Sequence, residues 1–329
     1  MTQASRPVRG PRFYQASTAH VPARDRFDYW RSLFGGARLA PLGDRAQYNA
    51  HLAGCDGDDD MVFTAMACAP TAADYAGQDN SHLRMSIVTH GALHVTDSKD
   101  HRTVFHPGHR LALFDASRPG WVDSPTGYRA LHLTLPRPLV LAALGGDPTG
   151  GALLRDNLPT TTLSTMLTAQ LDVLARQGAR MDTYEVSKAM QTVSALATAY
   201  LGQLRDKAGE PTPEAAMFTS ACALIDQWKA DPALSAQRVA QALGCSRANL
   251  ARLFERHGIR IGAYIRQRRL AHGKQLLRDP ALDVGEVARR AGYAGAQVFD
   301  RAFRHRYGLS PRDWKQLCHE TRTAKAAAP

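Results

Sequence analysis

One predicted helix near the C-terminus carries side chains suited to reading DNA bases. Four polar residues recur there at i, i+3, i+4 and i+7, which a helix turns to one side: Gln297, Asp300, Arg301 and Arg304. Arginine and glutamine pair bidentately with guanine and adenine edges in a major groove, which accepts one α-helix. Asp300 either accepts from a cytosine amino group or pairs with Arg304 and orients it. The apolar side is predicted to face inward through Val298, Phe299, Ala302 and Phe303.

A second segment upstream has the same layout. Residues 238–259 are echoed by 286–309, with Gly244 matching Gly292. Each copy reads as a short helix, a glycine turn and a second helix, which is the arrangement of a helix-turn-helix. In the first copy Ser246 is placed to cap the second helix. The outward residues of that helix are predicted to be Arg247, Ala248, Ala251 and Arg252.

A third helix is predicted between the copies, over 261–278, where Asp279 and Pro280 end it. A rigid connector holds two recognition helices at the separation of successive major grooves, about 34–36 Å. Lys274 is expected to contact a phosphate, so that its loss weakens binding to all sequences alike. The other interpretation of the connector's basic residues is a solvated face: Arg266, Arg268, Arg269 and Lys274.

The charge distribution favours a polyanionic partner for this C-terminal part. The 329 residues carry a net charge of +11, and residues 210–329 hold +9 of it. Such a segment favours nucleic acid over an acidic membrane surface. The chain is longer than the roughly 100–200 residues of an ordinary domain and is 44% hydrophobic, which indicates two domains with cores of their own.

The N-terminal half has the pattern of strands followed by helices. Apolar and polar residues alternate over 83–135, which predicts short antiparallel strands in a sandwich or barrel. Helical periodicity follows Pro136, and two prolines after Gly209 mark a domain boundary. One apolar stripe at helical spacing either packs on the strands or forms a seam between two copies: Val186, Met190, Val193, Ala197, Tyr200, Leu201 and Leu204.

Residues 215–317 resemble the DNA-binding domain of the AraC/XylS family of bacterial transcription regulators. The motifs are LSAQRVAQALGCSRANLARLF (234–254), YIRQRRLAHGKQLLRDP (264–280) and VGEVARRAGYAGAQVFDRAFRHRYGLSPRDW (284–314), the last ending in the family's Gly-x-Ser-Pro-x-x-aromatic pattern. The resemblance implies binding of double-stranded DNA and activation through RNA polymerase. It also implies base-facing positions at Ala248, Ala251, Arg252, Ala296, Gln297, Asp300 and Arg301. The two alanines of the first unit depart from the richer family pattern, because they can touch thymine methyls but cannot hydrogen-bond.

The N-terminal half resembles, less specifically, the cupin-like effector and dimerisation domain of this family. The residues are FDYWRSLF (27–34), HPGHRLALFDASRP (106–119) and LHLTLPR (131–137). The resemblance implies a homodimer that responds to a small molecule of unknown identity.

The expected fold class is therefore α+β with two domains. A cupin-like antiparallel β-barrel with packed helices precedes an all-α domain, in which a linker helix joins two helix-turn-helix units. The expected bounds are 13–208 for the effector domain, 209–214 for a linker and 215–318 for the DNA-binding domain, with disordered ends at 1–12 and 319–329.

The histidines raise the alternative of a cupin-type enzyme fused to a DNA-binding domain, since nine of the thirteen lie in the N-terminal half. Such a metal site needs a His-x-His pair with a following Glu, whereas Glu185, in a predicted helix, is the sole Glu before residue 210. We therefore expect a regulator without catalytic residues, metal or cofactor. A pocket for the effector needs a few polar anchors, and the candidates are Arg84, His94, Trp121 and His132.

Five scattered cysteines without a CxxC pair fit the reducing cytoplasm and leave a thiol-based redox-sensing regulator as another alternative. None lies in the Pro-Cys-His-Arg setting of a DNA-repair methyltransferase. The sequence shows no apolar leader and no stretch of 18 apolar residues, so we expect a cytoplasmic protein that does not span a membrane.

Overall fold

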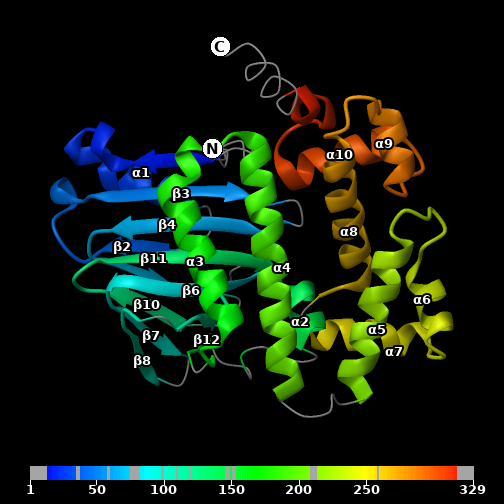
Figure 1. Ribbon diagram of the computed structural model, residues 1–329, viewed down its shortest axis with the longest axis horizontal. Helices are drawn as coiled ribbons and strands as arrows, with labels where there is room; N and C mark the ends of the chain where they lie inside the picture. Colours follow the sequence, from blue (N-terminus) through cyan, green and yellow to red (C-terminus); the bar gives the residue numbers. More distant parts are fainter. Residues whose placement is uncertain are drawn as a thin grey trace. The chain divides into compact units, whose positions relative to one another are not determined.

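The computed structural model divides the chain into two units (Figure 1). The first comprises Met1–Gly57, Met61–Arg137 and Pro148–Tyr200, and the second comprises Asp58–Asp60, Pro138–Asp147 and Leu201–Pro329. The predicted ends and most of the predicted linker lie outside the described residues, so the expected domain bounds stay predictions. The structure describes residues 13–316 except 35–37, 58–59, 75–81, 98–99, 109, 117, 119, 145–148, 150–152, 157, 208–212 and 258.

Two antiparallel sheets form the body of the first unit. The larger has seven strands in the order β1-β3-β4-β11-β6-β9-β12: β1 (Tyr14–Ser17), β3 (Ala50–Asp56), β4 (Val62–Cys68), β11 (Tyr128–Pro136), β6 (His82–Gly91), β9 (Ala112–Phe114) and β12 (Leu154–Arg155). The smaller has the order β2-β5-β10-β7-β8: β2 (Arg38–Pro41), β5 (Thr71–Asp74), β10 (Gly120–Ser124), β7 (Leu93–Asp97) and β8 (Arg102–Phe105). The predicted antiparallel β domain is confirmed, although its described strands form two sheets rather than one closed barrel.

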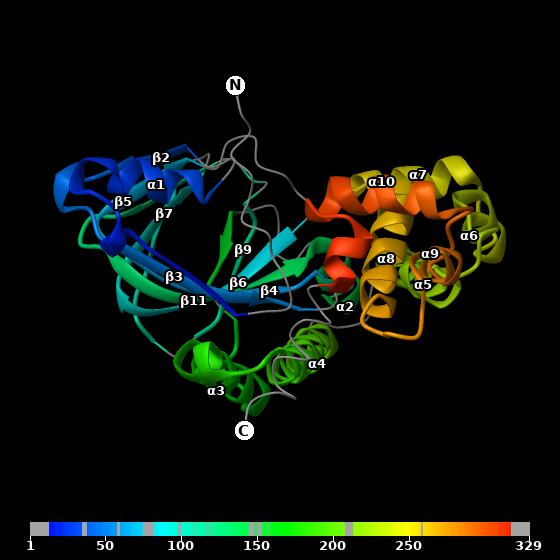
Figure 2. The same cartoon turned by 90° about the horizontal axis from the view of Figure 1, so that it is seen from above.

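The alternation along β11 gives the larger sheet two different faces. Ala130 shares a buried cluster with Val88 of β6 and with Val95 and Val122 of the smaller sheet, so this face looks toward the smaller sheet. His132 lies two residues further on and therefore points to the same side. Leu131, Leu133 and Leu135 alternate with these residues and point to the opposite face, which α3 (Thr162–Gln177) covers where it contacts β11 and β4 (Figure 2).

The long helix α4 (Thr183–Lys207) carries the apolar stripe predicted at 186–204. All seven residues of this stripe are buried within the chain. Tyr200 also donates a hydrogen bond from its hydroxyl to the carbonyl oxygen of Pro159 at 2.8 Å. A face that is already covered cannot meet a second copy. The stripe is therefore packed within the chain, and its interpretation as a dimer seam is wrong.

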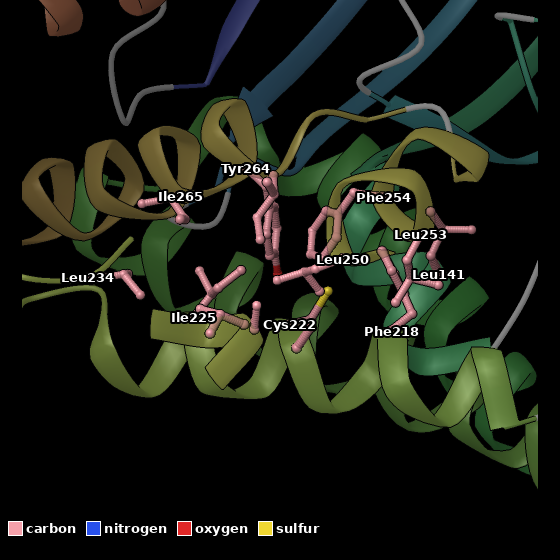
Figure 3. Packing of buried hydrophobic residues seen from close by; sticks show 14 residues of the cluster. Leu141, Phe218, Cys222, Ile225, Leu234, Leu250, Leu253, Phe254, Tyr264 and Ile265 are labelled. Carbon is pink, nitrogen blue, oxygen red and sulfur yellow. The ribbon is translucent and has the colours of Figure 1, made fainter. Parts of the chain in front are cut away.

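The described part of the second unit is helical. One core of this unit holds Phe218, Ile225, Leu250, Phe254 and Tyr264 (Figure 3). A second core gathers Phe299 and Phe303 around Trp314. The helices are α2 (Arg137–Leu144), α5 (Pro213–Trp228), α6 (Ala236–Ala242), α7 (Arg247–Arg256), α8 (Ile261–Leu276), α9 (Val284–Arg290) and α10 (Ala296–Tyr307).

The two predicted helix-turn-helix units are α6–α7 and α9–α10, joined by α8. Gly244 and Gly292 form their turns with φ of +64° and +77°, a left-handed conformation that glycine adopts without strain. At Gly292 an added Cβ would also lie 2.6 Å from the carbonyl oxygen of Lys229, so the position has no room for a side chain. These local signals explain why the repeat was readable from the sequence.

Candidate nucleic-acid interface

Helix α7 presents one polar face to solvent because its other face packs into the core that it shares with α5 and α8. Ser246 caps the helix by accepting from the amide of Asn249 at 3.1 Å. Leu250, Leu253 and Phe254 are buried. The predicted outward residues lie on the opposite side, where Arg247, Ala248 and Arg252 are exposed and Ala251 is half-buried.

Helix α10 repeats this arrangement with a richer polar face. Phe299 and Phe303 are buried, whereas the predicted residues Ala296, Gln297, Arg301 and Arg304 are exposed. Asp300 accepts from Nε of Arg304 at 2.8 Å, which is the local pair considered as one of its two roles. This carboxylate raises the pKa of the Arg304 guanidinium.

Three of these exposed arginines have no carboxylate partner among the described residues: Arg247, Arg252 and Arg301. Many other arginines of the second unit are paired, as Arg256 is with Glu214 at 3.0 Å. An unpaired guanidinium keeps all its donors available to phosphates or base edges. The polar faces of α7 and α10, here called the reading faces after their predicted role, thus combine exposure, positive charge and free hydrogen-bond donors.

The structure corrects the placement of Val298. This residue was predicted to face inward, but it is 52% exposed and lies on the same side of α10 as Arg301. Its position three residues before Arg301 was the sequence signal that pointed outward. Its apolar type alone favours the core, but Phe299 and Phe303 already fill the core at this point.

The structure also corrects the role predicted for Lys274. This side chain is 3% exposed, and its Nζ lies 4.9 Å from the ring centre of Trp314 and 5.1 Å from that of Tyr307. A buried ammonium over two aromatic rings cannot reach a DNA phosphate. Lys274 therefore stabilises the packing of α8 against the second helix-turn-helix unit.

Two of the neighbouring arginines of α8 also make contacts within the unit, whereas Arg266 is exposed. Arg268 pairs with Asp226 of α5. Arg269 donates to the carbonyl oxygens of Lys229 at 3.1 Å and Asp231 at 2.6 Å. These contacts tie α8 to α5 and to the turn that follows it. For Arg268 and Arg269 both interpretations, as DNA contacts or as a solvated face, are replaced by a bracing role. For the exposed Arg266 both interpretations stay predictions.

The four candidate effector residues fall on two different faces of the first unit. Arg84 and His132 share the face of the larger sheet that looks toward the smaller sheet, where Thr134 pairs with Arg84 and Ser86 with His132. In the smaller sheet His94 and Trp121 alternate with Val95 and Val122, which point inward, so both lie on its outer face. Trp121 is 41% exposed. The structure brings together only Arg84 and His132.

His132 is buried with half of its hydrogen-bonding capacity unused. Its Nδ1 lies 2.9 Å from Oγ of Ser86, whereas Nε2 has no hydrogen-bond partner among the described residues. Burial, and secondarily the charge of Arg84, hold the pKa of His132 well below its usual value. A neutral imidazole with a free nitrogen and a nearby guanidinium is suited to hold a small polar molecule.

The geometry of the described residues gives little support to the alternative functions, a metal-dependent enzyme or a thiol-based redox sensor. The described residues contain no group of three or more His, Cys, Asp or Glu side chains that is arranged for a metal ion. Burial raises the pKa of the Cys55, Cys68 and Cys222 thiols, to about 11 for Cys68 and about 12 for Cys222, which disfavours the reactive thiolate. Cys245 is half-buried, and Cys318 lies outside the described residues.

No helix in the described part of the chain has the length and apolar character needed to cross a membrane.

Comparison with known proteins gives matches to DNA-binding regulators. Residues 239–317 match the helix-turn-helix domain family. The transcriptional activator NphR of Rhodococcus sp is 28% identical over 231 residues, which cover 68% of this chain and 67% of NphR. The uncharacterized regulator YijO of Escherichia coli K12 is 30% identical over 170 residues, 47% of this chain and 60% of YijO. This chain therefore aligns with about two thirds or less of these relatives.

Solved structures of similar chains include the AraC-like transcriptional activator CuxR, with a TM-score of 0.47 and 16% identity over 78% of this chain and 93% of CuxR. ToxT of Vibrio cholerae has a TM-score of 0.40 and 10% identity over 78% of this chain and 97% of ToxT.

Proposed function

Since the chain belongs to the AraC family of DNA-binding transcription regulators, we propose that it activates transcription by placing α7 and α10 in two successive major grooves of promoter DNA. The observation that carries this proposal is the matched pair of polar faces on these two helices. Arg252 and Arg301 occupy the same position of each face, six residues after Ser246 and Gly295, the residues that precede the two helices.

The connection through α8 supports reading by both helices at once. Tyr264 and Ile265 in the first half of α8 belong to the core around α7, whereas Leu270 and Leu277 belong to the core around α10. One helix that is packed into both cores keeps the two reading faces at a constant separation. The DNA therefore has to present two sequence blocks about one helical turn apart.

We further propose that a small-molecule effector binds between the two sheets of the first unit. Arg84, Ser86 and His132 supply the polar groups, and the buried, unpaired Nε2 of His132 supports this location. His94 and Trp121 lie on the outer face of the smaller sheet and therefore do not belong to this site. The effector regulates transcription only if it binds one state of the protein more tightly than another.

Two further partners are proposed from the resemblance to the family. RNA polymerase is the partner for activation, and a homodimer forms through the first unit by a surface other than the buried stripe of α4. We place the protein in the cytoplasm, where promoter DNA and polymerase are accessible.

The proposal is tested by selecting random duplex DNA with the full-length protein at fixed, near-physiological salt. We expect enrichment of two sequence blocks about one helical turn apart, and a second copy of this pair if the protein binds as a dimer. Salt-sensitive binding without any enriched sequence would mean that the second unit attaches to DNA by charge alone. That result would overturn the proposal.

A further inference from the structure

Val298 is an apolar side chain exposed at the start of the second reading helix. Among the residues that the structure describes, it is the one large hydrophobic side chain after residue 200 that is exposed. Single exposed hydrophobic residues are common on protein surfaces, so exposure alone has no meaning. The location of Val298 makes its exposure informative, because the N-terminal residues of a recognition helix are those that contact base edges.

The residues that precede Val298 leave the end of the helix open. Gly295 precedes α10, and Ala296 is its first residue. An added Cβ at Gly295 would meet no atom within 4 Å, and its φ of −176° is open to any residue. Neither packing nor backbone conformation within the unit therefore requires glycine. The absence of a side chain instead lets a base pair approach the first turn of α10 closely.

The side chains around Val298 divide the reading face by chemistry. Asp300 and Arg304 engage each other at 2.8 Å, whereas Gln297 and Arg301 have no hydrogen-bond partner among the described residues. Val298 lies one helical turn before Arg301 and has no hydrogen-bonding group. The apolar feature that a major groove offers to such a side chain is the C5-methyl group of thymine.

We propose that Val298 reads the C5-methyl group of a pyrimidine in the half-site that α10 contacts, with thymine as the natural base. This inference rests on the proposed placement of α10 in the major groove. Three residues of helix advance about 4.5 Å, close to the rise of one base-pair step, about 3.4 Å. The thymine therefore lies one step from the base pair that Arg301 reads, which is a guanine if Arg301 makes the commonest arginine contact.

The test uses the full-length protein and the operator obtained by selection. Each thymine is replaced singly by deoxyuridine, which removes only the C5-methyl group, and affinity is measured by fluorescence anisotropy. At one position beside a guanine we expect the wild type to lose about fourfold in affinity, the value of burying one methyl-sized group. V298A should bind the thymine and deoxyuridine duplexes equally.

Side-chain variants distinguish the methyl contact from a general change in the helix. V298T keeps one methyl group at nearly the same volume, and it should retain the preference for thymine. V298S lacks that methyl group and should lose the preference. V104A, at an exposed valine of β8 in the first unit, is the matched control and should behave as the wild type. Thermal unfolding followed by circular dichroism checks that each variant is folded.

The source of the methyl group is tested at the same position. Cytosine and 5-methylcytosine are compared there, and the wild type should prefer the methylated base by about the same factor. Equal responses of wild type and V298A to every deoxyuridine substitution would overturn the inference and would leave Val298 as a surface for a protein partner. A selection that enriches no sequence is a different result, because it overturns the proposed function itself.

Discussion

At the scale of single residues, the arginines of the second unit fall into two groups. Arg268 and Arg269 are engaged with carboxylate or carbonyl oxygens of α5 and its following turn. Arg252 and Arg301 project from the reading faces without such partners among the described residues. The second group is therefore the one whose loss should change DNA binding without changing stability.

Replacing Arg301 with Ala is expected to weaken binding to the selected operator by about 1–3 kcal/mol and to relax the preference at one base pair. The reason is the loss of a bidentate donor from the major groove. Anisotropy titrations and a repeated selection measure both effects, and thermal unfolding should be unchanged. Arg176→Ala is the control, because this exposed helix arginine lies in the first unit. Unchanged affinity and preference would remove Arg301 from the base-reading set.

His132 makes the stability of the first unit depend on pH. Its pKa in the folded protein is lowered by burial, so the unfolded chain takes up a proton as the pH falls below about 6.5 while the folded chain does not. Stability from the neutral imidazole is present above that pH and is lost below it. At pH 5.5 the loss from this residue should be about 1.4 kcal/mol.

The variant His132→Gln should remove this part of the pH dependence, because glutamine stays neutral and polar. Urea unfolding at pH 7.5 and 5.5 provides the measurement. His101→Gln, at an exposed histidine, should keep the wild-type difference between the two pH values. If wild type and His132→Gln lose the same stability over this interval, His132 is not the titrating group.

At the scale of elements, α8 acts as a brace rather than as a DNA contact. Arg268 and Arg269 contact α5 and its following turn, and Lys274 lies toward α10, whereas Arg266 is exposed. A helix of ordinary amphipathic design would turn these charges to solvent. The contacts on several sides of α8 explain the difference, because they leave it little free surface.

Removing Lys274 should therefore lower stability and spare the electrostatics of DNA binding. Lys274→Ala removes the ammonium from the rings of Tyr307 and Trp314 and leaves a cavity where its apolar stem packs. We expect a loss of about 2 kcal/mol in the free energy of unfolding, measured by urea titration. The dependence of binding on salt should be unchanged, whereas a phosphate contact would reduce its slope by about 1. Unchanged stability with a reduced slope would restore the original prediction.

At the scale of the whole molecule, in the proposed function the double helix-turn-helix acts as one rigid DNA-binding unit. The two cores share α8, with Ile265 in one and Leu270 in the other. A flexible tether would let each unit search separately. If both helices bind DNA as proposed, the shared helix makes the spacing of the two DNA blocks as important as their sequence.

Inserting five base pairs between the two selected blocks turns one of them by about half a helical turn. We expect binding of the full-length protein to fall to that of a single block, because α8 prevents α7 and α10 from following the displaced groove. An insertion of ten base pairs restores the face of the DNA but not the distance, and should not restore the affinity. Retained affinity with either insertion, measured by anisotropy, would contradict a rigid DNA-binding unit.

The sequence by itself determined the features that depend on near neighbours in the chain. The glycine turns at Gly244 and Gly292, the cap at Ser246 and the spacing of Phe299 and Phe303 each follow from local backbone geometry. The alternation in β11 predicted antiparallel strands for the same reason. Such signals need only a few consecutive residues, which is why the helix-turn-helix repeat and most of the exposed residues of α7 and α10 were predictable.

Tertiary structure decided which side chains are buried and which remain exposed. Lys274 is buried because Tyr307 and Trp314 come to lie beside it, and Val298 is exposed because two phenylalanines already fill the core. The stripe of α4 is covered within the chain, and His94 is separated from His132 by the two-sheet arrangement. The outcomes for Lys274, for the α4 stripe and for His94 depend on residues far away in the sequence, whose positions no local pattern records.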